Sequence, residues 1–498
     1  MVFLSIRGYA FVRCSVPRLR RDDRRWGALV DMLPGLRGER GGNGAVRDSA
    51  RRAASRIRGN RSRTERGWAA MRRRARPDDR CLPVETKTRG AWVVHHADKL
   101  ERVVNRTDFE NIEHAGKAGQ FLSALAGSED VALDNARVEA LAKANNIPRA
   151  ELPAIKDTLK RQKLIEVGKH GIDVLGATTG QVLTHVAGMF DSLSPTAEEQ
   201  AVITLAEETS ETPLDLSTAA KLLGDTHKLS STEALELLGR AEDAGFVDGE
   251  EVDRQTRLLF NGHIFRKGEG DKIRNVLSSL SPAEAKLVTE VSELLKRAGC
   301  VPRADVEKRL TKPVFDKLHA IGMFDVNTVE NSSDAIQYVT RPQAFGKFGD
   351  PFVEDALDNA KAFVACLTYG MTRRSSGEGR ISMLSALLGR LNAGMEVGPA
   401  TAIGEDYEVL EMKGVVSLRH AFGSRYFMKL LKPEVGKLAL KVLTDGDAST
   451  ESLSSFPGAA VARYGKPEHN RAETRKNTKP SRKGQRDVLV ALRSGKTR

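Results

Sequence analysis

The chain is poor in aromatic residues and has no long apolar run. Phe, Trp and Tyr together make up only 5% of its 498 residues, although 40% of the residues are hydrophobic. The longest apolar stretch, "AFVACLTYGM" at 362–371, is well short of the roughly 18 residues that a membrane-spanning helix needs. We therefore expect a soluble protein without a membrane partner, built from small helices rich in Ala and Leu.

Cysteine is scarce, and the motifs of common active sites are missing. The four cysteines, Cys14, Cys81, Cys300 and Cys366, lie far apart without a CxxC pair, which argues against a zinc ribbon or a disulfide framework and favours a reducing cytoplasm. The ten histidines form no HExxH motif, and no GxSxG, kinase or P-loop pattern is present. We therefore expect no catalytic residues, no metal and no cofactor, and a protein that is not an enzyme.

Positive charge is abundant but unevenly distributed. The first 80 residues hold 22 Arg, no Lys and 8 acidic residues, and residues 449–498 hold 12 basic and 4 acidic residues. The two ends together carry more positive charge than the net charge of +13, so the residues between them are net acidic. The basicity of the whole chain is therefore no evidence that its central part binds DNA.

Both ends of the chain are predicted to be disordered. Residues 1–90 are Arg-rich and polar, without a sustained apolar period. We interpret them either as an arm that neutralises phosphates or, as we favour, as upstream sequence read from a start codon placed too early, with Met71 as the true start. Residues 449–498 form a basic tail that either adds nonspecific phosphate contacts or only keeps the protein in solution.

A short pattern recurs four times between these ends. A helical run ends in a tight turn and a short apolar strand in the segments "LKRQKLIEV" (159–167), "LGRAEDAGFVD" (238–248), "LHAIGMFDV" (318–326) and "LEMKGVVSL" (410–418). In three of them a glycine, Gly245, Gly322 or Gly414, precedes the strand, where a left-handed C-cap ends a helix without a side-chain clash. Each run follows a shorter helix and a turn, which predicts a helix-turn-helix followed by a hairpin.

The tetrapeptide "SLSP" marks the start of two of these repeats, near residues 192 and 279. Ser194 and Ser281 are predicted N-caps, each followed by proline at the first helical position and by Glu in the first turn. We predict four units: unit 1 at 100–190, unit 2 at 191–268, unit 3 at 272–345 and unit 4 at 350–446.

The end of unit 4 resembles a known superfamily. Its hairpin, expected to turn at Gly423 and Ser424, and the helix "LKPEVGKLALKVL" after it are similar to the end of bacterial winged helix-turn-helix regulators of the MarR and PadR kind. The resemblance covers about 50 residues closely and the other units loosely. It implies a mainly α chain with small β wings, a tandem array of about four winged helix-turn-helix domains between disordered tails.

The candidate contacts to double-stranded DNA are the basic residues of three units, because Arg and Lys reach phosphates and Arg, Lys and Gln reach base edges. They are Lys156, Lys160, Arg161, Gln162 and Lys163 in unit 1, Lys308, Arg309, Lys312 and Lys317 in unit 3, and Arg373, Arg374, Arg380, Arg419, Arg425 and Lys429 in unit 4. For the hairpin of unit 4 we leave open that Phe422, Tyr426 and Met428 form a core face and that the basic residues are only solvated.

Two function classes remain open. The first is a DNA-binding protein, a bacterial transcriptional regulator or a component of DNA maintenance or of a mobile element, located in the cytoplasm and on the nucleoid. The second is an assembly scaffold, because the corresponding helices of units 2 and 4 are acidic and suit protein partners rather than DNA. That charge is carried by Glu233, Glu236, Glu242 and Asp243 in unit 2, and by Glu405, Asp406, Glu408 and Glu411 in unit 4.

Overall fold

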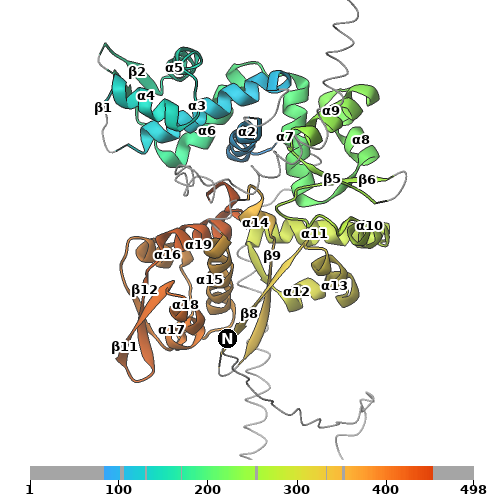
Figure 1. The fold of residues 1–498 in the computed structure, drawn as a ribbon. Coiled ribbons are helices and arrows are strands. Elements are labelled where there is room, and N and C mark those ends of the chain that lie inside the picture. The colour runs from blue at the N-terminus through green and yellow to red at the C-terminus, as the bar shows by residue number, and fades with distance from the viewer. Residues whose placement is uncertain are drawn as a thin grey trace, which may run out of the picture. The chain divides into compact units, whose positions relative to one another are not determined.

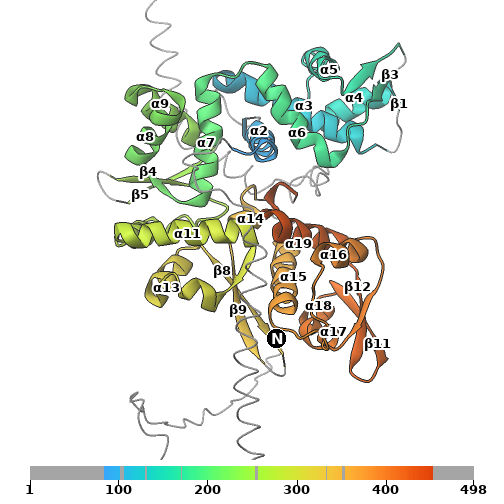
Figure 2. The same ribbon diagram turned by 180° about the vertical axis from the view of Figure 1, so that it is seen from behind.

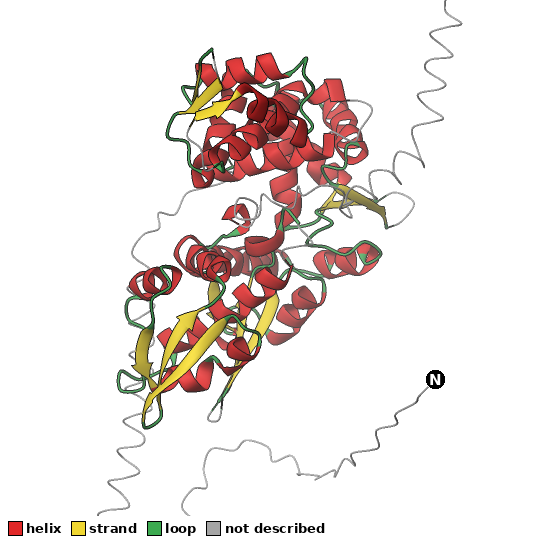
Figure 3. Ribbon diagram, turned by 60° about the vertical axis from the view of Figure 1, so that its left-hand side comes forward, coloured by secondary structure: helices red, strands yellow, loops and turns green. Residues whose placement is uncertain are grey.

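The computed structural model describes residues 84–100, 106–128, 132–169, 171–252, 256–331, 334–349 and 354–451. These residues are mainly helical, and their strands form four small antiparallel sheets of three strands each (Figures 1 and 3). The prediction of a mainly α chain with small β elements is therefore confirmed. None of the helices in these ranges is long and apolar enough to span a membrane. The predictions for Met71 and for the basic tail after residue 451 lie outside the described residues.

Unit 1 is preceded by a helix that the sequence did not predict. Helix α2 (Thr86–Leu100) begins inside the segment expected to be disordered, so the predicted limit at residue 90 is wrong. The reason is burial: Trp92 and Val93 are almost completely buried, and Gly90 lies so close to the backbone of Leu183 that a Cβ atom would not fit. Helix α2 therefore belongs to the packed part of the chain.

Unit 1 contains three helices, a hairpin and a closing helix. Its elements are η2 (Arg106–Phe109), α3 (Glu110–Ala126), β1 (Ala132–Asp134), α4 (Asn135–Ala144), α5 (Leu152–Arg161), β2 (Ile165–Val167), β3 (Gly171–Val174), η3 (Thr179–Gln181) and α6 (Val182–Ser192). Strand β3 lies between β1 and β2. Helices α3 and α6 pack against α2.

Unit 2 repeats the order helix, strand, helix, helix, hairpin. Its elements are α7 (Ala197–Glu211), β4 (Leu214–Asp215), α8 (Leu216–His227), α9 (Ser231–Asp243), β5 (Asp248–Glu251) and β6 (Arg257–Phe260). The last strand again lies between the first and the second.

Unit 3 has the same order after one extra helix. Its elements are α10 (Gly270–Ser278), α11 (Pro282–Ala298), β7 (Cys300–Pro302), α12 (Arg303–Glu307), α13 (Lys312–Ala320), β8 (Asp325–Glu330) and β9 (Ala335–Thr340), with α14 (Gln343–Gly346) leading to unit 4. Strand β9 lies between β7 and β8.

Unit 4 keeps the order but inserts a helix before its first strand. Its elements are α15 (Glu354–Thr372), α16 (Leu384–Asn392), β10 (Val397–Ala400), α17 (Thr401–Asp406), α18 (Glu408–Met412), β11 (Val416–Phe422), β12 (Arg425–Leu430) and α19 (Pro433–Asp445). Strand β12 pairs with both β10 and β11. In both views the β11–β12 hairpin points away from α15, α16 and α19 (Figures 1 and 2).

The third helix of every unit ends in the same way. Gly245, Gly322 and Gly414 adopt positive φ angles of 78°, 82° and 63°, as predicted from the sequence. In unit 1 the equivalent residue is Lys163, with φ 57°. Its amide donates to the carbonyl of Lys160, and the next amide donates to that of Leu159, the same pair of bonds that closes the other three helices. The sequence missed this fourth member because it lacks the glycine.

The two "SLSP" segments differ in the structure. Ser281 caps α11, with Pro282 in the first turn and Glu284 completing a capping box, as predicted. In the first copy the prediction is wrong: Thr196 caps α7, and its box partner is Glu199. Thr196 is favoured because Glu199 is three residues after it, and because the buried Glu199 carboxylate also accepts hydrogen bonds from Asn111.

Apolar side chains join the units in two pairs. One core cluster contains buried residues of α2, unit 1 and unit 2, and a second contains buried residues of units 3 and 4. Burial of this kind stabilises by about 25 cal/mol per Å² of apolar surface. Each pair of units therefore shares one hydrophobic core.

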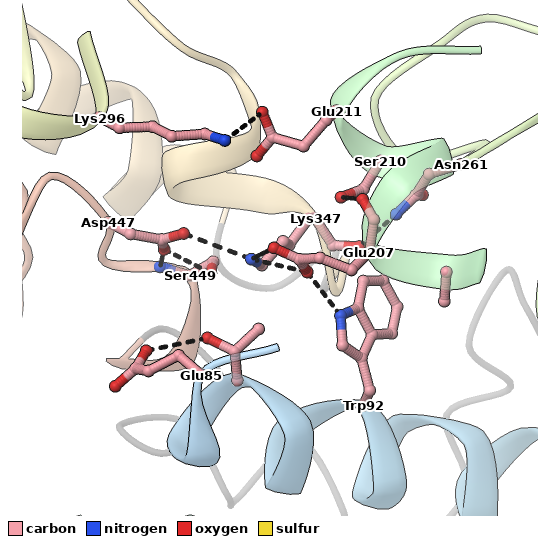
Figure 4. A network of polar contacts seen from close by, with 12 residues as sticks. Glu85, Trp92, Glu207, Ser210, Glu211, Asn261, Lys296, Lys347, Asp447 and Ser449 are labelled. Carbon is pink, nitrogen blue, oxygen red and sulfur yellow. Dashed lines mark hydrogen bonds and ion pairs between the residues drawn. The ribbon is translucent and has the colours of Figure 1, made fainter. Parts of the chain in front are cut away.

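A buried polar junction connects the two pairs (Figure 4). The Lys347 ammonium group is 1% exposed, and it lies 3.0 Å from the Glu207 carboxylate on α7 and 3.3 Å from Asp447 after α19. The Trp92 indole donates to Glu207 at 2.7 Å. Arg341 donates to both oxygens of Glu211, at 2.7 and 2.9 Å. Helix α2 and units 2, 3 and 4 thus meet around two carboxylates that are one turn apart on α7.

The charges of this junction stabilise one another. Burial alone would lower the pKa of Lys347, but Glu207 and Asp447 raise it well above its usual value. Burial would also raise the pKa of Glu211, but Arg341 and Lys296 hold it below the usual range. Both groups are therefore charged at neutral pH, and their charges are used inside the fold.

Candidate nucleic-acid interface

The third helix of unit 1, α5, presents cations to solvent. Leu152, Ile155 and Leu159 are buried and fix the orientation of the helix. Lys160, one turn after the half-buried Lys156, is exposed on the opposite side. Lys163 follows at the left-handed C-cap and is also exposed. The core thus directs three of the five predicted residues outward.

These five residues differ in whether their side chains are free to contact a phosphate. Arg161 pairs with Asp157 at 3.2 Å, and Gln162 caps the helix through its backbone. Lys156, Lys160 and Lys163 form no ion pair with any residue that the structure describes. An exposed cation without a carboxylate partner keeps its full charge for a phosphate.

The hairpin of unit 1 adds a cation that was not among the predicted DNA contacts. Lys169 lies in the turn between β2 and β3, and it is exposed. The signal was available, because the segment "IEVGKHGIDVLG" has the composition of a hairpin with lysine at its tip.

The basic residues of unit 3 are partly neutralised. Lys308 forms an ion pair with Asp305, and Lys317 donates to the Ser279 hydroxyl at 3.3 Å. Arg309 and Lys312, between α12 and the start of α13, are exposed and form no ion pair within the described ranges. Unit 3 therefore has fewer available cations than unit 1.

The hairpin of unit 4 has two different faces. Met428 and Leu430 are buried, whereas Lys429 on the alternate position is exposed. Phe422, near the turn, is 60% exposed and therefore does not belong to the core face. The Arg425 guanidinium lies 5.6 Å from the centre of the Phe422 ring. The open alternative is thus resolved in part: Met428 packs inward, while Phe422 and the basic residues face solvent.

Arg419 of the same hairpin is less available for a phosphate contact than Arg425 and Lys429. Its guanidinium stacks on Phe427, 4.4 Å from the ring centre, and pairs with Glu396 at 2.6 Å. Both charged groups are substantially exposed, so the pair is weak and screened by salt. Arg425 and Lys429 have no such pair among the described residues.

The loop after α15 does not present three arginines together. Arg374 is 7% exposed, and its guanidinium bonds to both Asp406, at 2.9 Å through Nε, and Glu405, at 2.7 Å. The expected phosphate contact of Arg374 is therefore wrong, because its charge is neutralised inside unit 4. Arg373 is exposed, and the Nε of Arg380 donates to the carbonyl of Met371.

The third helices of units 2 and 4 present acidic and apolar side chains instead. On α9, Glu236 and Asp243 are exposed beside Leu235, which is 47% exposed. On α18, Glu408 and Glu411 are exposed beside Val409 and Met412. Asp406, one of the acidic residues predicted to face a protein partner, forms an ion pair with the buried Arg374 instead. These two helices retain a surface that a duplex would repel.

Potential metal ligands do not cluster in the described residues. No group of three or more His, Cys, Asp or Glu side chains in these ranges could hold a metal ion. Burial raises the pKa of the Cys300 and Cys366 thiols to about 12, so neither is a thiolate near neutral pH. The three surfaces of units 1, 3 and 4 remain the best-supported candidate sites.

Comparisons with known proteins identify no relative. No protein-family model, no curated protein and no solved structure matches the chain.

Proposed function

We propose that this chain binds double-stranded DNA through a tandem array of four winged helix-turn-helix units. Support for the fold comes from the element order, in which each unit has a helix, a strand, two helices and a hairpin. The sheet order, with the third strand between the first and the second, is the same four times. A winged helix is built in this order, with its third helix positioned to enter a major groove.

The observation that carries DNA binding is the surface of α5. Lys156 and Lys160 on the helix in the recognition position, and Lys163 just after its end, are cations without a carboxylate partner among the described residues. Contacts of this type neutralise phosphates and make binding salt-dependent. The exposed Arg425 and Lys429 of unit 4 supply a second set on a hairpin, where wings commonly touch the backbone or the minor groove.

The test uses the full-length chain and a fluorescent duplex of random sequence, with binding followed by anisotropy over a series of salt concentrations. The variant carries Lys156→Glu, Lys160→Glu and Lys163→Glu. Its matched control carries Lys221→Glu, Lys286→Glu and Lys437→Glu, which are exposed lysines on α8, α11 and α19. Both variants change the net charge equally, so any contribution of the basic ends is the same in both.

We expect the α5 variant to lose about 100-fold in affinity at moderate salt and the control to lose about threefold or less. The slope of log affinity against log salt should also fall in the α5 variant by about one per lost contact. Equal losses in both variants, or no duplex binding by the wild-type chain, contradict the proposal.

The second candidate is an assembly scaffold, favoured by the acidic and apolar surfaces of α9 and α18. On α18, Val409 is 56% and Met412 is 74% exposed, so two apolar side chains share the exposed surface of Glu408 and Glu411. A scaffold without DNA binding would give no salt-dependent affinity for any duplex.

A further inference from the structure

Unit 4 contains a segment that the other units lack. In units 1 to 3 the first strand begins two to six residues after the first helix ends, whereas in unit 4 residues 373–396 separate α15 from β10. This segment forms a loop and helix α16, and together with β10, β12 and α17 it lines a solvent-open cavity of about 360 Å³. The volume lies in the range of small-molecule sites.

The walls of this cavity are mostly apolar. Ile381, Leu387, Val397, Ile403 and Met428 line it, from the loop, α16, β10, α17 and β12. Val397, Ile403 and Met428 are buried and belong to the core of units 3 and 4, so the inner wall is fixed by packing.

The loop beside the cavity is joined to α15 and to α17 by backbone hydrogen bonds. The amide of Ile381 donates to Gly370 on α15, and the Glu378 carbonyl accepts from Ala402 on α17. Gly379 has a φ of 103°, and a Cβ atom there would lie 2.4 Å from the Cβ of Ala400. The loop therefore depends on glycine to approach the end of β10, and the cavity does not need to form on ligand binding.

Two arginines without a carboxylate partner among the described residues line the same cavity. Arg380 donates through Nε to the Met371 carbonyl at 3.1 Å, and Arg390 donates to the Glu396 carbonyl at 3.4 Å. Neither arginine forms an ion pair with a carboxylate in the described ranges. Two carboxylates, Glu396 and Asp406, also line the cavity, but Asp406 is paired with Arg374 and Glu396 is paired with Arg419.

We propose that this cavity binds a small organic carboxylate with an apolar body. The apolar walls would hold the body, and the guanidinium groups of Arg380 and Arg390 would bind the carboxylate, for which their fork geometry is suited. The site does not rest on the proposed DNA binding, because ligand binding is measured without DNA.

The test uses 2-naphthoate as the probe and 2-naphthamide, its neutral analogue, as the matched ligand, with binding to the full chain followed by fluorescence. We expect saturable binding of naphthoate and at least tenfold weaker binding of naphthamide, because the amide lacks the charge that the arginines bind. Arg380→Gln with Arg390→Gln should weaken naphthoate at least tenfold and leave naphthamide nearly unchanged. Arg373→Gln, an exposed arginine of the same loop that does not line the cavity, should bind as the wild type does.

A second variant separates loss of the site from loss of fold. Ala386 lines the cavity and is exposed on α16, so Ala386→Trp should fill the space and block both probes while the melting temperature stays close to that of the wild type. Equal affinity for the two probes, unchanged naphthoate binding in the double arginine variant, or unchanged binding in Ala386→Trp would overturn the proposal.

Discussion

The cations of α5 and those of the junction around α7 are used in opposite ways. Lys160 on α5 is exposed and has no carboxylate partner among the described residues, whereas Lys347 is 1% exposed and lies between Glu207 and Asp447. Both are lysines in a chain of high positive charge, and nothing in their side-chain chemistry distinguishes them. The difference teaches that burial and pairing decide whether a positive charge stabilises the fold or remains available for a ligand.

Removing the buried cation Lys347 should have the greatest effect on stability. Lys347→Met leaves Glu207 and Asp447 without their shared cation, and we expect the free energy of unfolding to fall by about 3 kcal/mol. Urea unfolding followed by circular dichroism measures it. The matched control is Lys160→Met, the same chemical change at an exposed site, which should alter stability by less than about 0.5 kcal/mol. Similar losses in the two variants would contradict the distinction.

Exposed cations of the unit 4 hairpin should differ in their contribution to duplex binding. Arg425→Gln with Lys429→Gln should weaken duplex binding about tenfold, because both charges are exposed and lack an ion pair among the described residues. Arg419→Gln should weaken it about twofold, since Glu396 already shares the charge of Arg419. Anisotropy titrations at one salt concentration test this order, and a larger loss for Arg419→Gln than for the double variant would contradict it.

Acid should weaken the junction through Glu211. Its pKa is lowered in the folded state because Arg341 and Lys296 outweigh the effect of burial, so its stabilising contribution is complete above its unfolded pKa of about 4.5. The contribution is lost as pH falls through the lower folded value. We expect the wild-type stability to decline below about pH 5, and to decline less steeply in Glu211→Gln, by roughly 1 kcal/mol over two pH units. Parallel stability curves for the two proteins would remove Glu211 as the cause.

The smallest effect concerns Lys163, where stability and binding should change in opposite directions. Lysine in the left-handed region is strained, so Lys163→Gly should stabilise the protein by roughly 0.5 kcal/mol. The same change removes an exposed cation and should weaken duplex binding about threefold. Gly245→Lys in unit 2, the reverse change at the equivalent position, should destabilise by about 1 kcal/mol. If Lys163→Gly lowers stability, strain at this cap is not the controlling effect.

The features predicted correctly from the sequence are those that depend on residues close together in the chain. The glycines before the strands, Pro282 with Ser281, and the turn at Gly423 and Ser424 act within a few residues of themselves, and the structure places each as expected. The unpredicted features depend on distant parts of the chain. Helix α2 is stabilised by packing on α3 and α6, and the cavity of unit 4 is formed by elements up to about 60 residues apart.

Which basic residues of the candidate site are exposed could not be predicted from the sequence either. Arg373 and Arg374 are adjacent and looked equivalent, but one is exposed and the other is buried against Asp406. Adjacent residues on a chain leave a helix end in different directions, so sequence proximity carries no information about which partner each will find.

The amino-acid sequence alone set the repeated order of helices and strands, the positions of several caps and turns, and the excess of basic residues in the third helices of units 1 and 3. These properties follow from backbone conformation and from the spacing of apolar residues, which act locally. Only the tertiary structure decided which charges are available, because an ion pair requires two groups brought together from separate elements. Lys347 therefore became part of the core, while Lys156, Lys160 and Lys163 kept their charge at the surface.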